Sequence, residues 1–224
     1  MTHYAQVKIC GLTRLEDALV AAEAGADFLG FIFYPPSKRG ISVSDAAKFI
    51  PKLRQLPNCP TLVGVFVDET PEYVLDTLNR CELDIAQLHG NEVPSQINDP
   101  NSILHGRAYK ALRPQSLAEA EADAEWYIAE SPSFLPTLMM DSYHPEYYGG
   151  TGDLSDWEIG KAINKMTEGF MLAGGLTAEN VTQAITEVLP YAVDVASGVE
   201  ASPGIKDHSL VRAFINNAKS IRFK

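Results

Sequence analysis

A cysteine that directly follows a strand-forming run is the residue of this chain best placed to do chemistry. Residues 5–10 read Ala-Gln-Val-Lys-Ile-Cys, and Gly11, Leu12 and Thr13 come next. A threonine at this point can cap a helix, and a helix N-terminus favours the thiolate form of a nearby cysteine. Because α/β proteins place their chemistry where strands end, we expect Cys10 to be functional; an inert buried cysteine is the alternative.

Two opposite charges occur inside apolar strand segments near the two ends of the chain. Side chains alternate between the faces of a strand, so Lys8 shares a face with Cys10, and Asp194 lies on the inner face of its own segment. A buried lysine is costly unless it is paired. We therefore predict a Lys8–Asp194 ion pair, with either a substrate-facing role or a purely structural one.

Further groups capable of acid–base chemistry follow two other strand segments. Asp141 ends the run Pro-Thr-Leu-Met-Met, where it either caps a turn or points into the mouth of a site. Gln87 and His89 share one face, and a histidine at a strand end either contacts a substrate or only supports the structure. Cys10 and Asp141 could flank a small substrate, as a base on one side and an acid on the other.

Two glycine turns have the composition of a phosphate site. Gly174 and Gly175 follow one strand segment, and Ser197 and Gly198 follow the next one. Small residues let backbone N–H groups approach an anion, and the last two loops of an α/β barrel commonly hold phosphate. Ordinary tight turns are the alternative interpretation.

Two long loops could contribute to the same site. Arg39 lies in the loop after the second strand segment, where its guanidinium either is solvated or binds a carboxylate through two parallel hydrogen bonds. Residues 143–152 are rich in tyrosine and glycine. We expect them to form a lid that excludes water, with a disordered surface loop as the alternative.

The scaffold that positions these residues alternates strand and helix eight times. Helix starts are marked by capping sequences at Thr13, Thr70, Ser116 and Ser155. Strands are expected at residues 5–10, 27–33, 61–67, 84–88, 108–112, 137–141, 170–173 and 193–197. Eight such units in 224 residues predict an α/β fold, a single (β/α)8 TIM barrel with a parallel core over residues 1–224. An open doubly wound sheet is the alternative, but its usual G-x-G-x-x-G turn is missing.

Composition narrows the possible partners. The formal net charge of −11 argues against a nucleic acid, which requires a basic surface. No apolar run approaches the ~20 residues that a membrane span needs. The chain has three cysteines, an odd number without zinc spacing or a preceding signal peptide. We therefore expect reduced thiols in a cytoplasmic protein.

Taken together, these motifs resemble phosphoribosylanthranilate isomerase, a family of tryptophan biosynthesis. The similar segments run in order along the chain, at residues 8–13, 33–42, 63–68, 87–90, 140–142, 149–157, 173–181 and 193–200. The resemblance implies a (β/α)8 barrel that uses no metal and no cofactor. It also implies a small phosphosugar substrate and an enzyme that is either a monomer or a homodimer.

The reaction implied by this resemblance is an Amadori rearrangement. It converts N-(5-phosphoribosyl)anthranilate to 1-(2-carboxyphenylamino)-1-deoxyribulose 5-phosphate. Asp141 is similar to the general acid that opens the ribose ring, and Cys10 is similar to the general base that removes the C2 proton. Arg39 resembles the residue that holds the anthranilate carboxylate, and His89 and Asp194 resemble other pocket positions.

The chain departs from the family pattern near the lid and the phosphate loop, at Lys38, Asp153, Ser155 and Ala196. Two other functions compete with the resemblance. One is another phosphosugar barrel, such as the histidine-pathway aldose–ketose isomerase, which would carry an aspartate in place of Cys10. The other is an inactive barrel that binds a phosphosugar or a protein, against which the intact Cys10, Asp141 and Arg39 argue.

Overall fold

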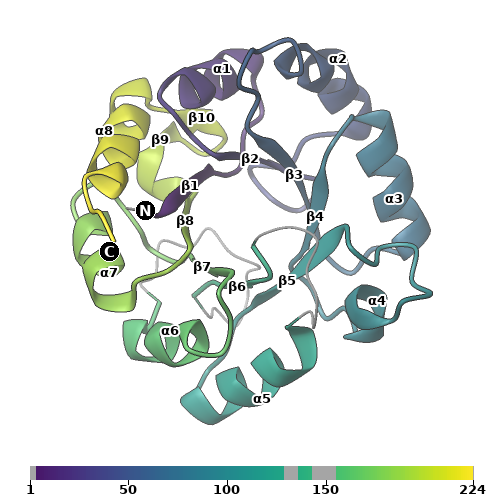
Figure 1. Cartoon of the computed structure of the whole chain (residues 1–224). Helices are drawn as coiled ribbons and strands as arrows, with labels where there is room; N and C mark the ends of the chain where they lie inside the picture. Colours follow the sequence, from purple (N-terminus) through teal and green to yellow (C-terminus); the bar gives the residue numbers. More distant parts are fainter. Residues whose placement is uncertain (1–3, 129–135, 143–154, 224) are drawn as a thin grey trace.

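Eight parallel strands close into a barrel in chain order, so that β1 pairs with both β2 and β8 (Figure 1). The structure, a computed structural model, describes residues 4–128, 136–142 and 155–223. The barrel strands are β1 (Gln6–Ile9), β2 (Phe28–Ile32), β3 (Thr61–Phe66), β4 (Ile85–Leu88), β5 (Ala108–Leu112), β6 (Leu138–Met140), β7 (Phe170–Leu172) and β8 (Ala192–Val195). The predicted (β/α)8 barrel is confirmed, and each strand begins and ends within one residue of its predicted segment, except that β8 ends two residues earlier than predicted.

Helices form an outer ring around these strands (Figure 1). They are α1 (Leu15–Glu23), α2 (Val43–Leu53), α3 (Pro71–Arg80), α4 (Ser95–Asn98), α5 (Leu117–Tyr127), α6 (Trp157–Asn164), α7 (Val181–Val188) and α8 (His208–Lys219). Between β8 and α8 the chain adds a short 3-10 turn, η1 (Ser197–Val199), and a hairpin of β9 (Glu200–Ser202) and β10 (Ile205–Lys206). This hairpin, absent from our predictions, lies between α8 and α1 (Figure 1).

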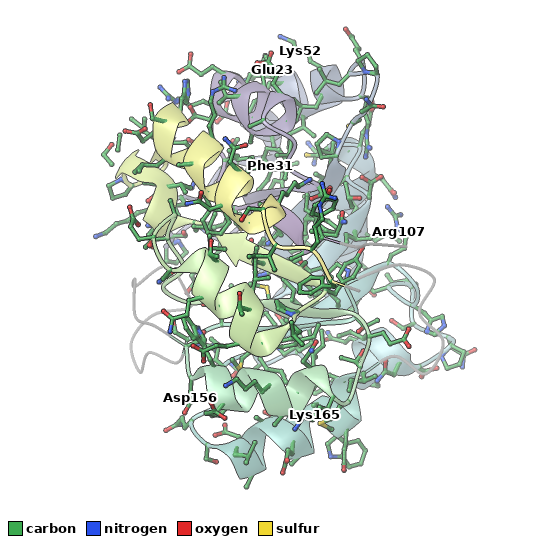
Figure 2. All side chains as sticks on the ribbon, turned by 60° about the vertical axis from the view of Figure 1, so that its left-hand side comes forward. Glu23, Phe31, Lys52, Arg107, Asp156 and Lys165 are labelled. Atoms are coloured by element: carbon green, nitrogen blue, oxygen red, sulfur yellow. The ribbon has the colours of Figure 1, made fainter. Side chains whose placement is uncertain are left out.

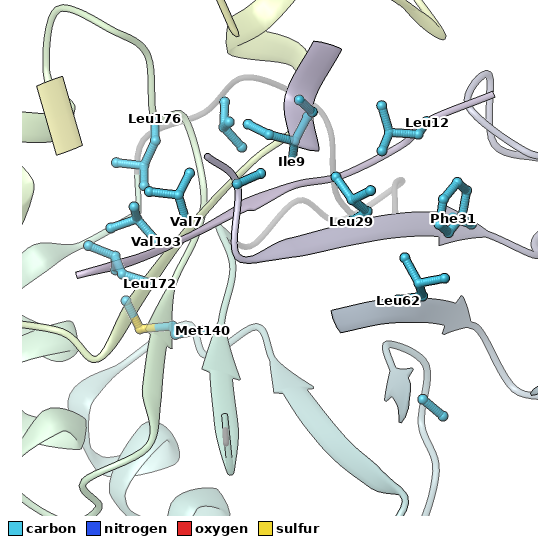
Figure 3. Close-up of a cluster of buried hydrophobic side chains, with 14 of the residues drawn as sticks. Val7, Ile9, Leu12, Leu29, Phe31, Leu62, Met140, Leu172, Leu176 and Val193 are labelled. Atoms are coloured by element: carbon cyan, nitrogen blue, oxygen red, sulfur yellow. The ribbon is translucent and has the colours of Figure 1, made fainter. Parts of the chain in front are cut away.

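Strand alternation divides the core into two layers. The outward-facing side chains of β1, Val7 and Ile9, belong to the large apolar layer between strands and helices, together with Leu29 and Leu172 (Figure 3). A smaller cluster fills the inside of the barrel, and its members are Phe28, Val63, Ile85, Tyr109, Ala111, Met139, Met171, Ala173 and Ala192. The polar residues of the inner face sit beside this cluster, as the alternation predicts.

Charged side chains cover the outside of the molecule. Figure 2 shows Glu23, Lys52 and Lys165 at the periphery, whereas Phe31 lies within the packed interior and is fully buried. No helix among the described residues is long and apolar enough to span a membrane. Asp153 and the lid predicted at residues 143–152 lie outside the described residues.

Two of the four predicted helix caps are confirmed. The hydroxyls of Thr70 and Ser116 accept hydrogen bonds from the N–H groups of Tyr73 and Glu119. Each of these bonds satisfies a backbone donor that has no partner inside its helix.

The other two cap predictions are wrong, because each hydroxyl is used in another contact. Thr13 donates to the carbonyl of Gly204 in the β9–β10 hairpin, and α1 begins after Arg14 without a side-chain cap. Ser155 donates to the carbonyl of Ala173, and the neighbouring Asp156 caps α6 in its place.

Candidate active site

The centre of the site is the ammonium group of Lys8, which points into the barrel from β1. Its Nζ donates to Gln87 Oε1 at 2.6 Å, and it lies 3.0 Å from Asp194 Oδ1 and 3.4 Å from Cys10 Sγ. Lys8 and Asp194 are also register partners across β1 and β8. The predicted ion pair is therefore confirmed.

The charges of this cluster decide its protonation. Burial opposes the charge on Lys8, but Asp194 together with Cys10 and Tyr109 outweighs it and holds the pKa of Lys8 above its usual value. Burial raises the pKa of the Cys10 thiol, and the positive charge of Lys8 offsets only part of this effect. The expectation that a helix N-terminus favours the thiolate is wrong, because α1 begins only at Leu15 and burial dominates.

A hydrogen-bond chain connects Lys8 to His89. Gln87 Oε1 accepts one hydrogen bond from Lys8 and another, of 2.8 Å, from the hydroxyl of Tyr109. These two donors fix the orientation of the Gln87 amide, with its NH₂ group on the opposite side. Gln87 Nε2 therefore donates to His89 Nδ1, at 2.9 Å. This network assigns the proton of the neutral imidazole to Nε2.

The Nε2 atom of His89 faces Asp141, which follows β6. It lies 3.4 Å from Asp141 Oδ2, while Oδ1 accepts a 2.8 Å hydrogen bond from the N–H of Ser142. Burial would raise the pKa of Asp141, but the nearby imidazole, the Ser142 N–H and the charge of Lys8 hold it below its usual range. A carboxylate with a proton-bearing neighbour is suited to transfer protons.

The structure brings the predicted acid–base residues together. One pocket at the carboxyl ends of the strands is lined by Cys10, Ile32, Tyr34, Ser37, Arg39, Val65, Val67, Gln87, His89, Asp141, Asp194 and Ala196. Cys10 and Asp141 thus contribute to the same pocket from β1 and β6. Both side chains are nearly inaccessible, with Cys10 5% and Asp141 8% exposed. A substrate held here would be largely shielded from water.

The predicted phosphate residues surround a neighbouring hollow. It shares Asp141, Asp194 and Ala196 with the first pocket, and its other lining residues are Ser142, Ala173, Gly174, Gly175, Leu176, Val195 and Ser197. Gly198 is not among them, but it lets the two glycine turns touch. A Cβ atom built at Gly198 would lie 2.0 Å from the carbonyl oxygen of Leu176.

Three residues near Cys10 were not predicted. They are Glu200, Lys206 and Gly30. The carboxylate of Glu200 forms a bidentate ion pair with Arg39, in which it accepts hydrogen bonds of 2.8 Å from Nε and Nη2, and Lys206 also contacts this carboxylate. Gly30 of β2 leaves room for the thiol, since a Cβ there would lie 2.7 Å from Cys10 Sγ. Gly30 could have been predicted, because a glycine inside a strand often marks the close approach of another group. The sequence carried no comparable signal for Glu200 or Lys206.

A wider hollow lies at the opposite end of the barrel, where the strands begin. Gln6, Pro190 and Tyr191 are among its lining residues. We place the active site at the narrower pocket, because that pocket contains the acid–base groups and lies at the end where barrel enzymes hold their chemistry.

Comparisons with known proteins identify the family of this chain. The family model described as N-(5'phosphoribosyl)anthranilate (PRA) isomerase matches residues 7–217. The chain belongs to this family. A relative of that name from Trichlorobacter lovleyi is 44% identical over 214 residues, which cover 96% of this chain and 98% of the relative. This enzyme is accordingly an aldose–ketose isomerase of tryptophan biosynthesis, and it isomerises N-(5'-phosphoribosyl)anthranilate.

Solved structures show the same similarity. The phosphoribosyl anthranilate isomerase of Thermotoga maritima is 40% identical, with a TM-score of 0.81, and the match covers 97% of this chain and all of that one. A second isomerase was solved in complex with reduced 1-(o-carboxyphenylamino)-1-deoxyribulose 5-phosphate. It is 37% identical, with a TM-score of 0.76 and the same coverage. These matches support a small phosphosugar as the ligand of this enzyme.

Proposed function

We propose that Cys10 and Asp141 are the general base and the general acid of the rearrangement. The observation that carries this proposal is their shared pocket, in which Lys8 contacts Cys10 and His89 faces Asp141. Transfer of a proton by a positioned group is worth about 10²–10⁴ in rate.

In the first step, Asp141 gives its proton to the ribose ring oxygen. The C1–O bond breaks, its electron pair stays on that oxygen, and the anthranilate nitrogen forms a C=N bond to C1. In the second step, the Cys10 thiolate removes the proton from C2, and the C–H electrons form the C1–C2 double bond of an enolamine. Tautomerisation of this enolamine gives the ketone product.

The remaining predicted site residues either hold the substrate or orient the two acid–base groups. Arg39 binds the anthranilate carboxylate from the loop after β2, in the same pocket as Cys10. Gly174, Gly175, Ser197 and Gly198 bind the phosphate through backbone N–H groups and the serine hydroxyl. The hollow next to Asp141, which all of these residues except Gly198 line, supports this assignment. Lys8, Gln87, His89 and Asp194 orient the two acid–base groups.

The experiment compares Cys10→Ala and Asp141→Asn with the unmodified enzyme. Phosphoribosylanthranilate is generated in situ, and its conversion is followed by fluorescence and product mass. Both variants should lose at least about 10²-fold in kcat and still bind reduced 1-(o-carboxyphenylamino)-1-deoxyribulose 5-phosphate. Near-normal turnover by either variant would remove that residue from its role.

We also propose that the enzyme works in the cytoplasm as a monomer or homodimer, with its whole chain forming one domain. Cys10, Cys59 and Cys81 are free thiols, which suits a reducing compartment. A similar isomerase from Thermotoga maritima is described as dimeric. Sedimentation velocity would distinguish the two assembly states.

A further inference from the structure

A buried cluster of three charged side chains adjoins the pocket, which Arg39 lines. It consists of Arg39 from the loop after β2, Glu200 from β9 and Lys206 from β10. The side chains of Glu200 and Lys206 are 5% and 0% exposed. Neither residue has a role in the steps proposed above. Burying charged side chains carries a desolvation penalty, so we asked what this cluster contributes to the site.

Glu200 is the centre of this cluster. Its Oε2 accepts from Arg39 Nη2 at 2.8 Å, and its Oε1 accepts from Arg39 Nε at 2.8 Å. The same Oε1 atom also accepts from the backbone N–H of Gly204 at 3.1 Å and from Lys206 Nζ at 3.2 Å. With this many donors, the carboxylate has a single well-defined orientation.

Lys206 connects the cluster to the strand that carries Asp194. Besides Glu200, its Nζ donates to the carbonyl of Ala196 at 2.8 Å. Ala196 lines both the acid–base pocket and the phosphate hollow. Lys206 thus ties the orientation of Glu200 to the wall of the active site.

The aliphatic part of Arg39 is fixed as well. Gly11 follows Cys10 with a φ of +73°, and a Cβ atom there would lie 2.8 Å from Arg39 Cδ. At the backbone, the N–H of Arg39 donates to the hydroxyl of Ser37 at 3.2 Å. The arginine is therefore held along its length, from its backbone to its guanidinium.

The negative charge of Glu200 is needed to balance the two cations beside it. Burial would raise the pKa of Glu200, but Arg39 and Lys206 hold it below its usual range. A neutral residue at this position would leave two buried cations facing each other. Glu200 engages the guanidinium of Arg39 through its Nε and Nη2 atoms.

We propose that Glu200 and Lys206 are positioning residues that hold Arg39 in the orientation that selects a carboxylate on the aromatic ring of the substrate. Lys206 orients Glu200, Glu200 orients Arg39, and Arg39 contacts the substrate. This proposal rests on the role given to Arg39 under the proposed function. It assigns to the β9–β10 hairpin a part in substrate specificity.

The test measures affinity for two ligands by calorimetry. One is reduced 1-(o-carboxyphenylamino)-1-deoxyribulose 5-phosphate, and the other is the same compound without the carboxylate. Glu200→Gln should weaken binding of the first ligand by about tenfold, while its affinity for the second stays within about twofold. Lys206→Met should act in the same direction with a smaller loss. Glu187→Gln, a matched change on the exposed face of α7, should alter neither affinity.

Glu200→Asp keeps the charge but is too short to retain both contacts to Arg39. It should give an intermediate loss of selectivity, and it carries the test if Glu200→Gln fails to fold. Equal weakening of both ligands, or no weakening of either, would overturn the positioning role. Arg39→Met separates the positioning role of Glu200 from the binding role of Arg39. If Arg39→Met also keeps full preference for the carboxylate, the proposed role of Arg39 itself fails.

Discussion

The pKa values of Cys10 and Asp141 are shifted in opposite directions, and these directions indicate which of the two groups holds a proton. Burial raises the pKa of Cys10, and the surroundings of Asp141 lower its pKa. Near neutral pH the pair therefore rests as a thiol and a carboxylate. In the mechanism proposed above, the reactive arrangement is a thiolate and a carboxylic acid, which together carry the same number of protons. Activity is thus possible only while the pair retains one proton.

This proton count predicts how activity falls at high pH. Ionisation of Cys10 removes the last proton, so ring opening loses its acid and kcat/KM declines. Because the thiol pKa is raised, this decline should begin above about 8.5, the ordinary value for cysteine. The charged groups acting on the thiol are Lys8, Asp194 and Lys206. The measurement is a pH profile of kcat/KM.

A variant of the same experiment tests the part played by Lys8. Lys8 lowers the thiol pKa, and its removal also leaves Asp194 without its cation. Both effects raise the thiol pKa, so Lys8→Met should move the alkaline limb to higher pH. A limb that moves to lower pH would contradict this account of the charges.

The close packing of Gly30 against Cys10 leads to a second prediction about a single residue. An alanine at Gly30 would place its Cβ 2.7 Å from Cys10 Sγ, and the thiol can move aside more easily than the backbone. Gly30→Ala should therefore fold but lower kcat by about 10²-fold, because a shift of about 1 Å in a reacting group has that effect. Steady-state kinetics and circular dichroism measure the two quantities.

Gly160→Ala is the matched control for this substitution. Its Cβ would meet neighbours only at 3.4 Å or more, inside α6, so kcat should not change. If Gly30→Ala turned over as fast as Gly160→Ala, the position of the thiol would not limit the reaction.

The site residues that were predictable are those whose neighbours follow from regular geometry. Lys8 and Asp194 were paired from strand alternation and barrel closure alone, and the structure confirms this pair. The Arg39–Glu200 pair was not predictable, because the two residues are 161 positions apart and neither lies in a barrel strand. Irregular loops carry no periodic signal that sets their contacts.

Among the elements, α1 is joined to the C-terminal part of the barrel by the buried carboxylate of Asp17. Asp17 accepts from Arg14 Nη2 at 2.8 Å and from the N–H of Lys206 at 3.2 Å, and it lies 2.8 Å from His208 Nε2. The side chain of Asp17 is fully buried. It therefore joins α1, the β9–β10 hairpin and the start of α8.

Asp17→Asn should lower the free energy of unfolding by about 2–3 kcal/mol at neutral pH, because it removes the carboxylate that accepts from the Arg14 guanidinium and the Lys206 N–H. Burial alone would raise the pKa of Asp17, but Arg14 and His208 lower it overall. Its contribution is thus present above the unfolded pKa of about 3.9 and is lost as pH falls through the lower folded value. Urea denaturation at neutral and acid pH measures the difference.

The neighbouring Glu16 provides a close control. It pairs with the same Arg14, but its side chain is 61% exposed. Glu16→Gln should change stability by no more than about 0.5 kcal/mol. Equal losses for the two substitutions would show that burial does not set the strength of these pairs.

Element types were easier to predict than the details of their ends. Strand positions followed from short apolar runs, whereas two of the four predicted caps were wrong. Thr13 and Ser155 have the right residue type for a cap, but tertiary acceptors at Gly204 and Ala173 take their hydroxyls. A local signal cannot show which distant carbonyl will compete for the same donor.

At the scale of the whole molecule, the site depends on closure of the barrel. Cys10 and Lys8 come from the first strand, Asp141 from the sixth and Asp194 from the last, and β1–β8 pairing brings the two ends of the chain together. A part of the barrel could not form this pocket. Ligand binding and folding of the complete barrel should therefore be linked.

This linkage predicts a single cooperative unfolding transition over the 224 residues, which a bound ligand moves as a whole. Reduced 1-(o-carboxyphenylamino)-1-deoxyribulose 5-phosphate at 100 times its Kd should add about 2.7 kcal/mol. For a chain of this size that corresponds to a rise in Tm of about 5–10 °C. Scanning calorimetry tests both points at once. Two separate transitions, of which the ligand moves only one, would show that the chain is not one folding unit and that the site lies in one part of it.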